Sequence, residues 1–198
     1  MTTIVYYGIG NPTAFINVFK RINRNCKIAT NQNDLKDASK IILPGVGHFD
    51  DALNKLKSSD MYEKINDLVV NKSVPVLGIC VGMQIMAISS EEGENRGLGW
   101  INGKVKKFNN IICPHMGWNE INVSKQSKLF SGIDRKLFYF LHSYYFECSE
   151  KSDELGISNY RNEFVSAVNK KNIYGVQFHP EKSHEAGEKL VKNFVDLC

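Results

Sequence analysis

The sequence predicts an α/β protein with a single open sheet, mixed but mostly parallel, that is flanked by helices. Short apolar runs alternate with amphipathic segments in the first half of the chain, which is typical of parallel strands joined by helices on both faces. From Trp100 onward the pattern changes to successive strands with alternating aromatic residues, so the sheet should be mixed. The chain has 198 residues, 42% of them hydrophobic, and no linker or internal repeat, so residues 1–198 should form a single domain.

The first half of the chain supplies strands and helices in alternation. A short apolar run predicts a strand at residues 4–7, and residues 12–23 predict a helix because Asn11 is a suitable N-cap and Pro12 suits the first helical position. The apolar residues of this helix share one face: Phe15, Ile16, Phe19 and Ile22. The same reasoning predicts the following elements: strands at residues 27–29 and 40–43, a helix near residues 60–71, a strand at residues 74–79 and an amphipathic helix after it.

Strand patterns dominate the second half of the chain. Alternation of apolar and aromatic residues with polar ones predicts strands near residues 120–123, 138–146, 164–169 and 173–178. A final helix is expected at residues 183–197, because apolar residues recur there at helical spacing, at Ala186, Leu190, Phe194 and Leu197.

Cys80 lies between Gly78 and Gly82, at the point where a buried strand changes to an amphipathic segment. A side chain on so sharp a strand-to-helix turn points out of the sheet toward a substrate, and the glycines relieve the crowding. The free N–H groups and the dipole at the start of the following helix favour a thiolate. The pattern predicts a nucleophilic cysteine, although a small buried cysteine at the end of a core strand would show the same pattern.

A second motif, His179-Pro180-Glu181, closes the strand expected at residues 173–178. Proline cannot donate to a sheet ladder, so Pro180 ends the strand and leaves His179 and Glu181 able to face the same way at the sheet edge. A cysteine nucleophile needs a base, and the base needs an acceptor on its other nitrogen. Cys80, His179 and Glu181 are therefore a candidate catalytic triad, whereas the tripeptide alone would more often be a surface turn.

The segment from Gly78 to Gln84, Gly-Ile-Cys-Val-Gly-Met-Gln, together with His179-Pro180-Glu181, resembles the class I (triad) glutamine amidotransferases. The resemblance covers the whole chain. It implies the flavodoxin-like fold of that family and hydrolysis of L-glutamine by a Cys-His-Glu triad. Residues 44–47 resemble the family's oxyanion loop, in which the backbone N–H groups of Val46 and Val81 would hold the oxyanion; losing one such donor typically costs ~10²–10³ in rate.

A narrower resemblance rests on three further strings. Residues 114–119 (Pro-His-Met-Gly-Trp-Asn), 139–144 and 8–11 are similar to those of the glutaminase subunit (HisH type) of imidazole glycerol phosphate synthase. It implies that ammonia passes within a heterodimer to a (β/α)₈-barrel cyclase subunit (HisF type), which forms imidazole glycerol phosphate and AICAR in histidine biosynthesis. The resemblance also implies a glutamine site made by Gly47, Gln84, Glu92, Ser143 and Tyr144, and a partner interface made by Asn11, Trp118, Tyr139 and Lys182.

The sequence leaves three alternatives open. Residues 97–101, 144–145 and 181–184 look more like a branch of the family that supplies ammonia for amidine formation on a surface-polysaccharide sugar. A cysteine hydrolase that releases its product to solvent would have the same triad. A non-catalytic scaffold subunit would retain the fold alone, and the intact triad argues against it.

Composition argues against several other classes of function. The net charge of +4 comes from scattered Lys and Arg residues, without the basic, aromatic-rich stripe that suits nucleic acid. No apolar run reaches the roughly 18 residues that a membrane span requires, and the first residues do not resemble a targeting signal, so we expect a cytoplasmic protein. Gly8-Ile9-Gly10 lacks the third glycine of a dinucleotide fingerprint, and no cofactor is expected.

The remaining cysteines and histidines predict no further chemistry. Five cysteines, an odd number, argue against a disulfide framework. Cys113 and His115 are too few ligands for zinc without a second pair, so no metal is expected. His48 and His184 should be hydrogen-bonded or exposed rather than catalytic, and the role of His142 stays open.

Overall fold

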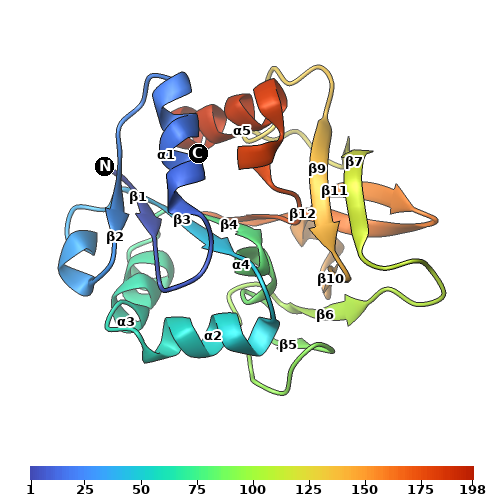
Figure 1. Cartoon of the computed structure of the whole chain (residues 1–198), viewed down its shortest axis with the longest axis horizontal. Helices are drawn as coiled ribbons and strands as arrows, with labels where there is room; N and C mark the ends of the chain where they lie inside the picture. Colours follow the sequence, from blue (N-terminus) through green and yellow to red (C-terminus); the bar gives the residue numbers. More distant parts are fainter.

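The computed structural model describes all 198 residues of the chain. Its strands form two sheets, and helices surround the larger one (Figure 1). The strands are β1 (Thr2–Val5), β2 (Cys26–Ala29), β3 (Lys40–Gly45), β4 (Val76–Cys80), β5 (Ser89–Ser90), β6 (Gly103–Lys107), β7 (His115–Glu120), β8 (Asn122–Val123), β9 (Leu137–His142), β10 (Tyr144–Cys148), β11 (Glu154–Tyr160), β12 (Asn162–Lys170) and β13 (Ile173–Val176). The α-helices are α1 (Pro12–Arg21), α2 (Phe49–Ser58), α3 (Tyr62–Asn66), α4 (Val81–Gln84) and α5 (His184–Leu197).

The large sheet has eleven strands and combines a parallel half with an antiparallel half. Its order is β2-β1-β3-β4-β13-β12-β10-β6-β5, with β11 beside β12 and β8 beside β11, while β7 and β9 form a separate antiparallel pair. Strands β2, β1, β3, β4 and β13 run parallel to one another, and β12 pairs antiparallel with β13. In Figure 1, α1 and α5 lie on one side of these strands and α2 and α3 on the other. The predicted α/β class with a mixed sheet is confirmed.

The register of the parallel strands brings their carboxyl ends to one edge of the sheet. Gly45 at the end of β3 is opposite Cys80 at the end of β4, and Val176 at the end of β13 is opposite Ile79. Open α/β sheets bind ligands at this edge. A functional site is therefore expected in the loops that follow these three strands.

The first helix forms as the sequence predicts. Asn11 is the N-cap of α1, and its side chain accepts a hydrogen bond from the Ala14 N–H at 3.1 Å. Pro12 occupies the first turn, where its missing N–H costs nothing. The buried face of α1, with Phe15 and Phe19, packs into a core of 52 buried apolar residues.

Several predicted elements have different boundaries in the structure. The strand expected at residues 4–7 lies two residues earlier, and the helix expected near 60–71 is α3 followed by a π-helical turn at Asp67–Asn71. The strand expected near 120–123 is only the two-residue β8, because the chain pairs with β9 earlier, as β7. The strand expected at 138–146 is broken at Ser143 into β9 and β10, which belong to different sheets.

Helix α2, strands β5, β6 and β11, and all but the last residue of β7 were not predicted. The signal for α2 is present in the sequence: His48 caps it, acidic residues fill its first turn, and its buried residues, Phe49, Ala52, Leu53 and Leu56, have helical spacing. Strand β6 has a single fully buried apolar residue, Val105, among lysines, so its pattern is weak. Strand β11 contains register shifts in its pairing with β12, which interrupt the alternation that predicts a strand.

Helix α5 packs closely against the short 3₁₀ turn Pro180–Lys182, which follows His179. Gly187 makes this approach possible. A Cβ added at Gly187 would overlap the carbonyl oxygen of Pro180, and the Gly187 N–H donates to the Ser183 carbonyl at 3.1 Å. The glycine in α5 thus fixes how the chain after β13 meets the last helix.

This packing reverses the usual effect of replacing a helical glycine by alanine. Alanine is normally favoured over glycine by about 0.8–1.0 kcal/mol in a helix interior. For Gly187→Ala we expect the free energy of unfolding to fall by ~1–3 kcal/mol instead, because the added methyl group must displace backbone. Urea denaturation measures the change, and Lys189→Ala, at an exposed position of the same helix, should change it by less than about 0.5 kcal/mol. A Gly187→Ala protein more stable than the parent would contradict the prediction.

Candidate functional site

Cys80 has the backbone conformation of a nucleophile elbow. It ends β4 and caps the one-turn helix α4, with φ 54° and ψ −115°. A positive φ in a residue other than glycine is a strained conformation that persists only where the surrounding structure imposes it. The elbow is closely packed on both sides of Cys80: a Cβ added at Gly82 would overlap the Leu43 carbonyl, and one added at Gly78 would overlap the Met86 side chain and the Gly82 backbone. The elbow that the sequence predicts is present, although the helix after it is short.

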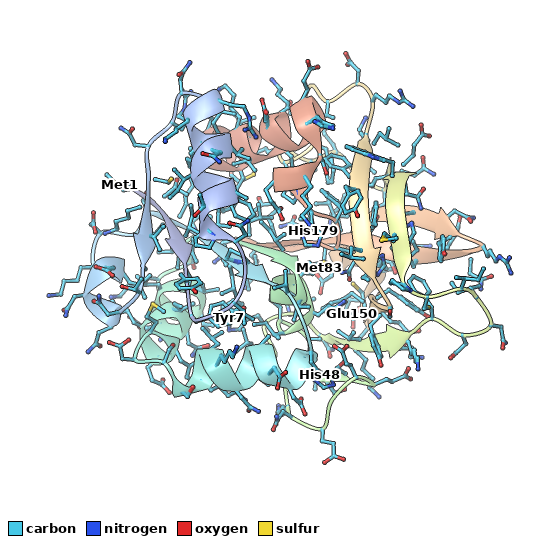
Figure 2. The ribbon with its side chains drawn as sticks, in the orientation of Figure 1. Met1, Tyr7, His48, Met83, Glu150 and His179 are labelled. Atoms are coloured by element: carbon cyan, nitrogen blue, oxygen red, sulfur yellow. The ribbon has the colours of Figure 1, made fainter.

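His179 and Glu181 meet in the loop after β13. The Nδ1 atom of His179 is 2.8 Å from Oε1 of Glu181, and the two side chains are only 4% and 7% exposed. The backbone of His179 is held from two sides: its N–H donates to the Tyr139 carbonyl of β9 at 2.9 Å, and its carbonyl accepts from the Ser183 hydroxyl at 2.6 Å. In Figure 2 His179 lies near the middle of the molecule, whereas His48 lies toward its outer edge.

The surroundings of His179 favour its protonated form. Burial works to lower the pKa of His179, but the hydrogen bonds and charges of Cys80 and Glu181 outweigh it and raise the pKa to about 10. Of the two carboxylate oxygens of Glu181, Oε1 pairs with His179 and Oε2 is buried without a hydrogen-bond partner. His179 is therefore the hydrogen-bond partner of this side chain. The arrangement can deliver a proton from His179 to a group bound at Cys80.

A cavity of about 280 Å³ lies over Cys80 and His179. The predicted oxyanion residues Val46 and Val81 line it, as do all five residues of the predicted glutamine site and Lys182. Glu181 does not line this cavity; it lies behind His179, beside a smaller space of about 180 Å³ that Asn11 and Lys182 also border. A larger groove of about 860 Å³, between Val123 and Lys136, contains none of the predicted residues.

Side-chain hydrogen bonds fix two of the predicted ligand-binding residues. Glu92 accepts from the Phe49 N–H at the start of α2 at 2.8 Å, which holds its carboxylate at the edge of the cavity. Gln84, on α4, is buried and uses its amide nitrogen twice, donating to the Tyr144 carbonyl and to the Gln177 side chain, both at 3.0 Å.

The predicted oxyanion loop, residues 44–47, begins with a restrained peptide. The buried hydroxyl of Tyr7 donates to the Pro44 carbonyl at 2.8 Å, and burial raises the pKa of Tyr7. A Cβ added at Gly45 would overlap the Gly82 N–H group, so β3 and α4 approach each other through glycines. Val46 follows at the cavity mouth with 46% of its surface exposed, and Gly47 has a φ of 91° that favours glycine.

Gln177 is a site residue that the sequence analysis missed. It is fully buried, and its amide nitrogen lies 3.7 Å from the Cys80 sulfur as a hydrogen-bond donor. Its own oxygen accepts from Gln84. A signal for it existed, since Gln177 lies two residues before His179, and alternate residues of an extended segment share a face.

His142 and His115 form a histidine pair beside the cavity, separate from the His179–Glu181 pair. His142 lies within 2.7 Å of the Tyr144 carbonyl through Nδ1 and within 3.0 Å of His115 Nδ1 through Nε2. Burial lowers the pKa of His142 to about 3 and that of His115 to about 4, so both are neutral near pH 7. The sequence left the role of His142 open and assigned none to His115 beyond excluding zinc.

Three of the four residues predicted to face a partner are contiguous on the surface. The half-exposed ring of Trp118 meets Tyr139 edge to face, and the Lys182 ammonium lies 5.6 Å from the centre of the Tyr139 ring. His184, which the sequence predicted to be hydrogen-bonded or exposed, is exposed and stacks on Trp118 with ring centres 5.2 Å apart. The fourth residue, Asn11, is exposed at the start of α1.

The remaining histidines, the thiols and the helices complete the description of the chain. No three His, Cys, Asp or Glu side chains gather closely enough to hold a metal ion, and His48 is exposed and caps α2 through its ring nitrogen. All five cysteines are free thiols. None of the helices has the length and apolar character needed to span a membrane.

Comparisons with known proteins give matches over almost the whole length of the chain. The family model for glutamine amidotransferase class-I matches residues 4–197. The chain is 50% identical to imidazole glycerol phosphate synthase subunit HisH of Leptospira borgpetersenii and 49% identical to that of Bdellovibrio bacteriovorus, with all of each chain covered. Its fold is similar to the structure of PurLQS from Thermotoga maritima, with a TM-score of 0.77 at 16% identity over 98% of this chain and 97% of that one.

The buried histidine pair predicts a pH dependence of stability. The folded pKa of His142, about 3, lies below the ordinary value of about 6.5 expected for the unfolded chain. The neutral ring therefore stabilises the fold fully above about pH 6.5, and this contribution is lost as the pH falls toward 3, by at most ~1.4 kcal/mol per pH unit. Urea denaturation between about pH 7 and pH 5 should show a shallower decline for His142→Asn than for the parent protein. Parallel declines would contradict this assignment.

Proposed function

The chain belongs to the class I glutamine amidotransferases, and on that premise we propose that it hydrolyses L-glutamine to glutamate and ammonia as the glutaminase subunit of imidazole glycerol phosphate synthase, in histidine biosynthesis. One observation carries the chemistry: Cys80 on its strained elbow and His179, paired with Glu181 at 2.8 Å, open onto the same cavity. The full-length similarity to HisH subunits supports the pathway.

In the first half of the reaction, the Cys80 sulfur attacks the carboxamide carbon of glutamine. His179 gives the proton on Nε2 to the departing nitrogen as the carbon–nitrogen bond breaks, which releases ammonia and leaves a thioester on Cys80. Glu181 accepts from Nδ1, keeps the ring oriented and stabilises its positive charge. The Val81 N–H at the first residue of α4 and the Val46 N–H are the donors for the oxyanion.

In the second half, water attacks the thioester carbonyl. His179 is now neutral and takes a proton from this water, the carbon–sulfur bond breaks, and glutamate leaves as the Cys80 sulfur is regenerated. The Gln177 amide, within 3.7 Å of that sulfur, stabilises the thiolate at both ends of the cycle. The cycle needs no metal or cofactor.

The cavity suits the amino-acid end of glutamine. Its volume of about 280 Å³ leaves space for a small amino acid beside Cys80. Glu92 supplies a carboxylate for the α-ammonium group, and the backbone at Ser143 and Tyr144 supplies polar groups for the α-carboxylate. Gln84 and Gly47 complete the lining.

The partner is a (β/α)₈-barrel cyclase subunit of the HisF type, docked over the mouth of the cavity. Large apolar side chains are exposed there: Val46 and Leu141 line the cavity, and Met116 and Trp118 lie on β7, which pairs with β9. Exposed apolar groups that cluster with an aromatic anchor are typical of a protein interface. We also place the protein in the cytoplasm, because its five free thiols suit a reducing compartment.

Complementation tests the pathway. Expressed with a barrel cyclase subunit from the same genome, this chain should restore growth without histidine to cells that lack their own glutaminase subunit. The Cys80→Ala variant should fail when glutamine is the nitrogen donor, because it has no nucleophile. High external ammonia should bypass that defect if the variant still folds and docks.

Failure of the parent chain to complement, although Cys80 still hydrolyses glutamine in vitro, would contradict the histidine assignment. Loss of an amidino sugar from the cell surface on gene deletion would then favour the sugar-amidating branch. Full turnover by the isolated chain, unchanged when the barrel subunit is added, would favour a hydrolase that releases ammonia to solvent.

Binding to the barrel subunit tests the interface. We expect Trp118→Ala to raise the Kd about 30-fold, because a central aromatic anchor is typically worth ~2 kcal/mol or more. Isothermal titration of the two subunits measures this. Val70→Ala removes another exposed apolar side chain, in the segment before the start of β4 and outside the cavity lining, and should leave the Kd unchanged. Equal affinities for the Trp118→Ala variant and the parent chain would place the interface elsewhere.

A further inference from the structure

The two histidines beside the cavity belong to a continuous chain of hydrogen bonds that starts on β7. The Asn119 amide nitrogen lies 3.3 Å from Nε2 of His115, whose Nδ1 lies 3.0 Å from Nε2 of His142. His142 in turn reaches the Tyr144 carbonyl through Nδ1 at 2.7 Å. None of these contacts is part of the Cys-His-Glu triad.

The direction of every hydrogen bond in this chain follows from its two ends. A carbonyl oxygen can only accept, so Nδ1 of His142 carries a proton, and the neutral ring then accepts at Nε2. His115 must therefore donate from Nδ1 and accept at Nε2. The Asn119 amide fits as the final donor, because its nitrogen also donates to the Asn159 carbonyl at 2.8 Å and its oxygen accepts from the Glu120 N–H at 2.8 Å.

Aromatic side chains shield the two histidines of this hydrogen-bond series from solvent. The His115 ring stacks on Phe140, with centroids 4.9 Å apart, and on Tyr160, with centroids 4.1 Å apart. His142 packs against Phe108 and Phe164. Both histidines are at most 6% exposed. An unsatisfied ring nitrogen in such surroundings would be costly, so the geometry selects one tautomer of each ring.

The series of hydrogen bonds ends at the Tyr144 carbonyl, where the polypeptide backbone passes from one sheet to the other. β9 and β10 belong to different sheets, and Ser143 is the single residue between them. The Ser143 carbonyl accepts from the Phe108 N–H at 3.2 Å, and the Tyr144 carbonyl accepts from both Gln84 and His142. With both carbonyls held, the Ser143–Tyr144 segment at the cavity wall has a fixed orientation.

We propose that His142 and His115 are positioning residues, a pair of neutral Nδ1–H tautomers that orients the Ser143–Tyr144 segment for the amino-acid end of glutamine. The proposal rests on the proposed function for its substrate. It accounts for two histidines that the triad mechanism does not use. It also ties the glutamine site to β7, because His115 is three residues before Trp118 on that strand.

Nitrogen NMR on histidine-labelled protein tests the tautomers directly. Near pH 7, long-range ¹⁵N–¹H correlation should show two neutral rings with the proton on Nδ1, and His115→Asn and His142→Asn should each remove one of them. A neutral free histidine prefers the Nε2–H form, so the expected result is not the default. Nε2–H forms, averaged tautomers or charged rings at these positions would overturn the proposal, and this measurement does not depend on activity.

Kinetics of the complex with the barrel subunit test the positioning role. His142→Leu removes the donor to Tyr144, whereas His142→Asn keeps an amide N–H near the position of Nδ1. We expect the KM for glutamine to rise about 10-fold or more in the leucine variant, with a smaller fall in kcat, and the asparagine variant to recover most of the loss. A purely structural role would not separate the two folded variants in this way.

The outcomes distinguish this proposal from the function on which it rests. If the parent complex hydrolyses glutamine and the leucine variant has an unchanged KM, or the asparagine variant is no better than the leucine variant, the positioning role is wrong and the proposed function stands. If the parent complex does not hydrolyse glutamine, both fail. Should His142→Leu not fold, His115→Leu and the tautomer measurement on the parent chain still decide the matter.

Discussion

The close approach of α4 to β3 is the constraint on which the site depends. Two glycines allow it: Gly82 lies against the Leu43 carbonyl and Gly45 against the Gly82 N–H. A third, Gly175, lets the side chain of Met83 of α4 pack closely on β13. Cys80 lies at this contact with a positive φ, and the contact brings the loop at residues 44–47 and the start of α4 together at the cavity. Larger side chains at these positions would force the elbow to relax, and the cysteine would then lose its position relative to His179.

The polar groups around Cys80 are buried, and almost all of them have hydrogen-bond partners. The Gln177 amide donates to the Cys80 sulfur, and its oxygen accepts from Gln84. Gln84 also donates to the Tyr144 carbonyl, which is the hydrogen-bond partner of His142 as well. Buried amides and rings are costly when unpaired, so each member of this set limits the positions of its neighbours. The site is therefore held by directional contacts in addition to the apolar core beneath it.

The sequence predicted the α/β class, the first helix, and Cys80 and His179 as partners, because the elbow, the strand end at Pro180 and the cap at Asn11 are local patterns. The other residues that line the cavity were implied only by the family resemblance. It did not predict the break at Ser143, since the aromatic alternation continues through a residue where the chain changes sheets. Nor did it find the roles of Gln177 and His115, whose partners are distant in the sequence: Cys80 is 97 residues from Gln177, and His142 is 27 residues from His115. Helix α2 is different, because its cap and spacing could have been recognised.

Strand β9 performs two tasks with alternate residues. Phe138, Phe140 and His142 are buried, while Tyr139 and Leu141 lie at the surface near the cavity mouth. It is the backbone of Tyr139, not its ring, that accepts the hydrogen bond from the His179 N–H. The outward side chains can therefore change during evolution without moving the histidine. A duplicated gene could acquire a new acceptor enzyme by altering this strand's outer residues and keep its ammonia-producing chemistry intact.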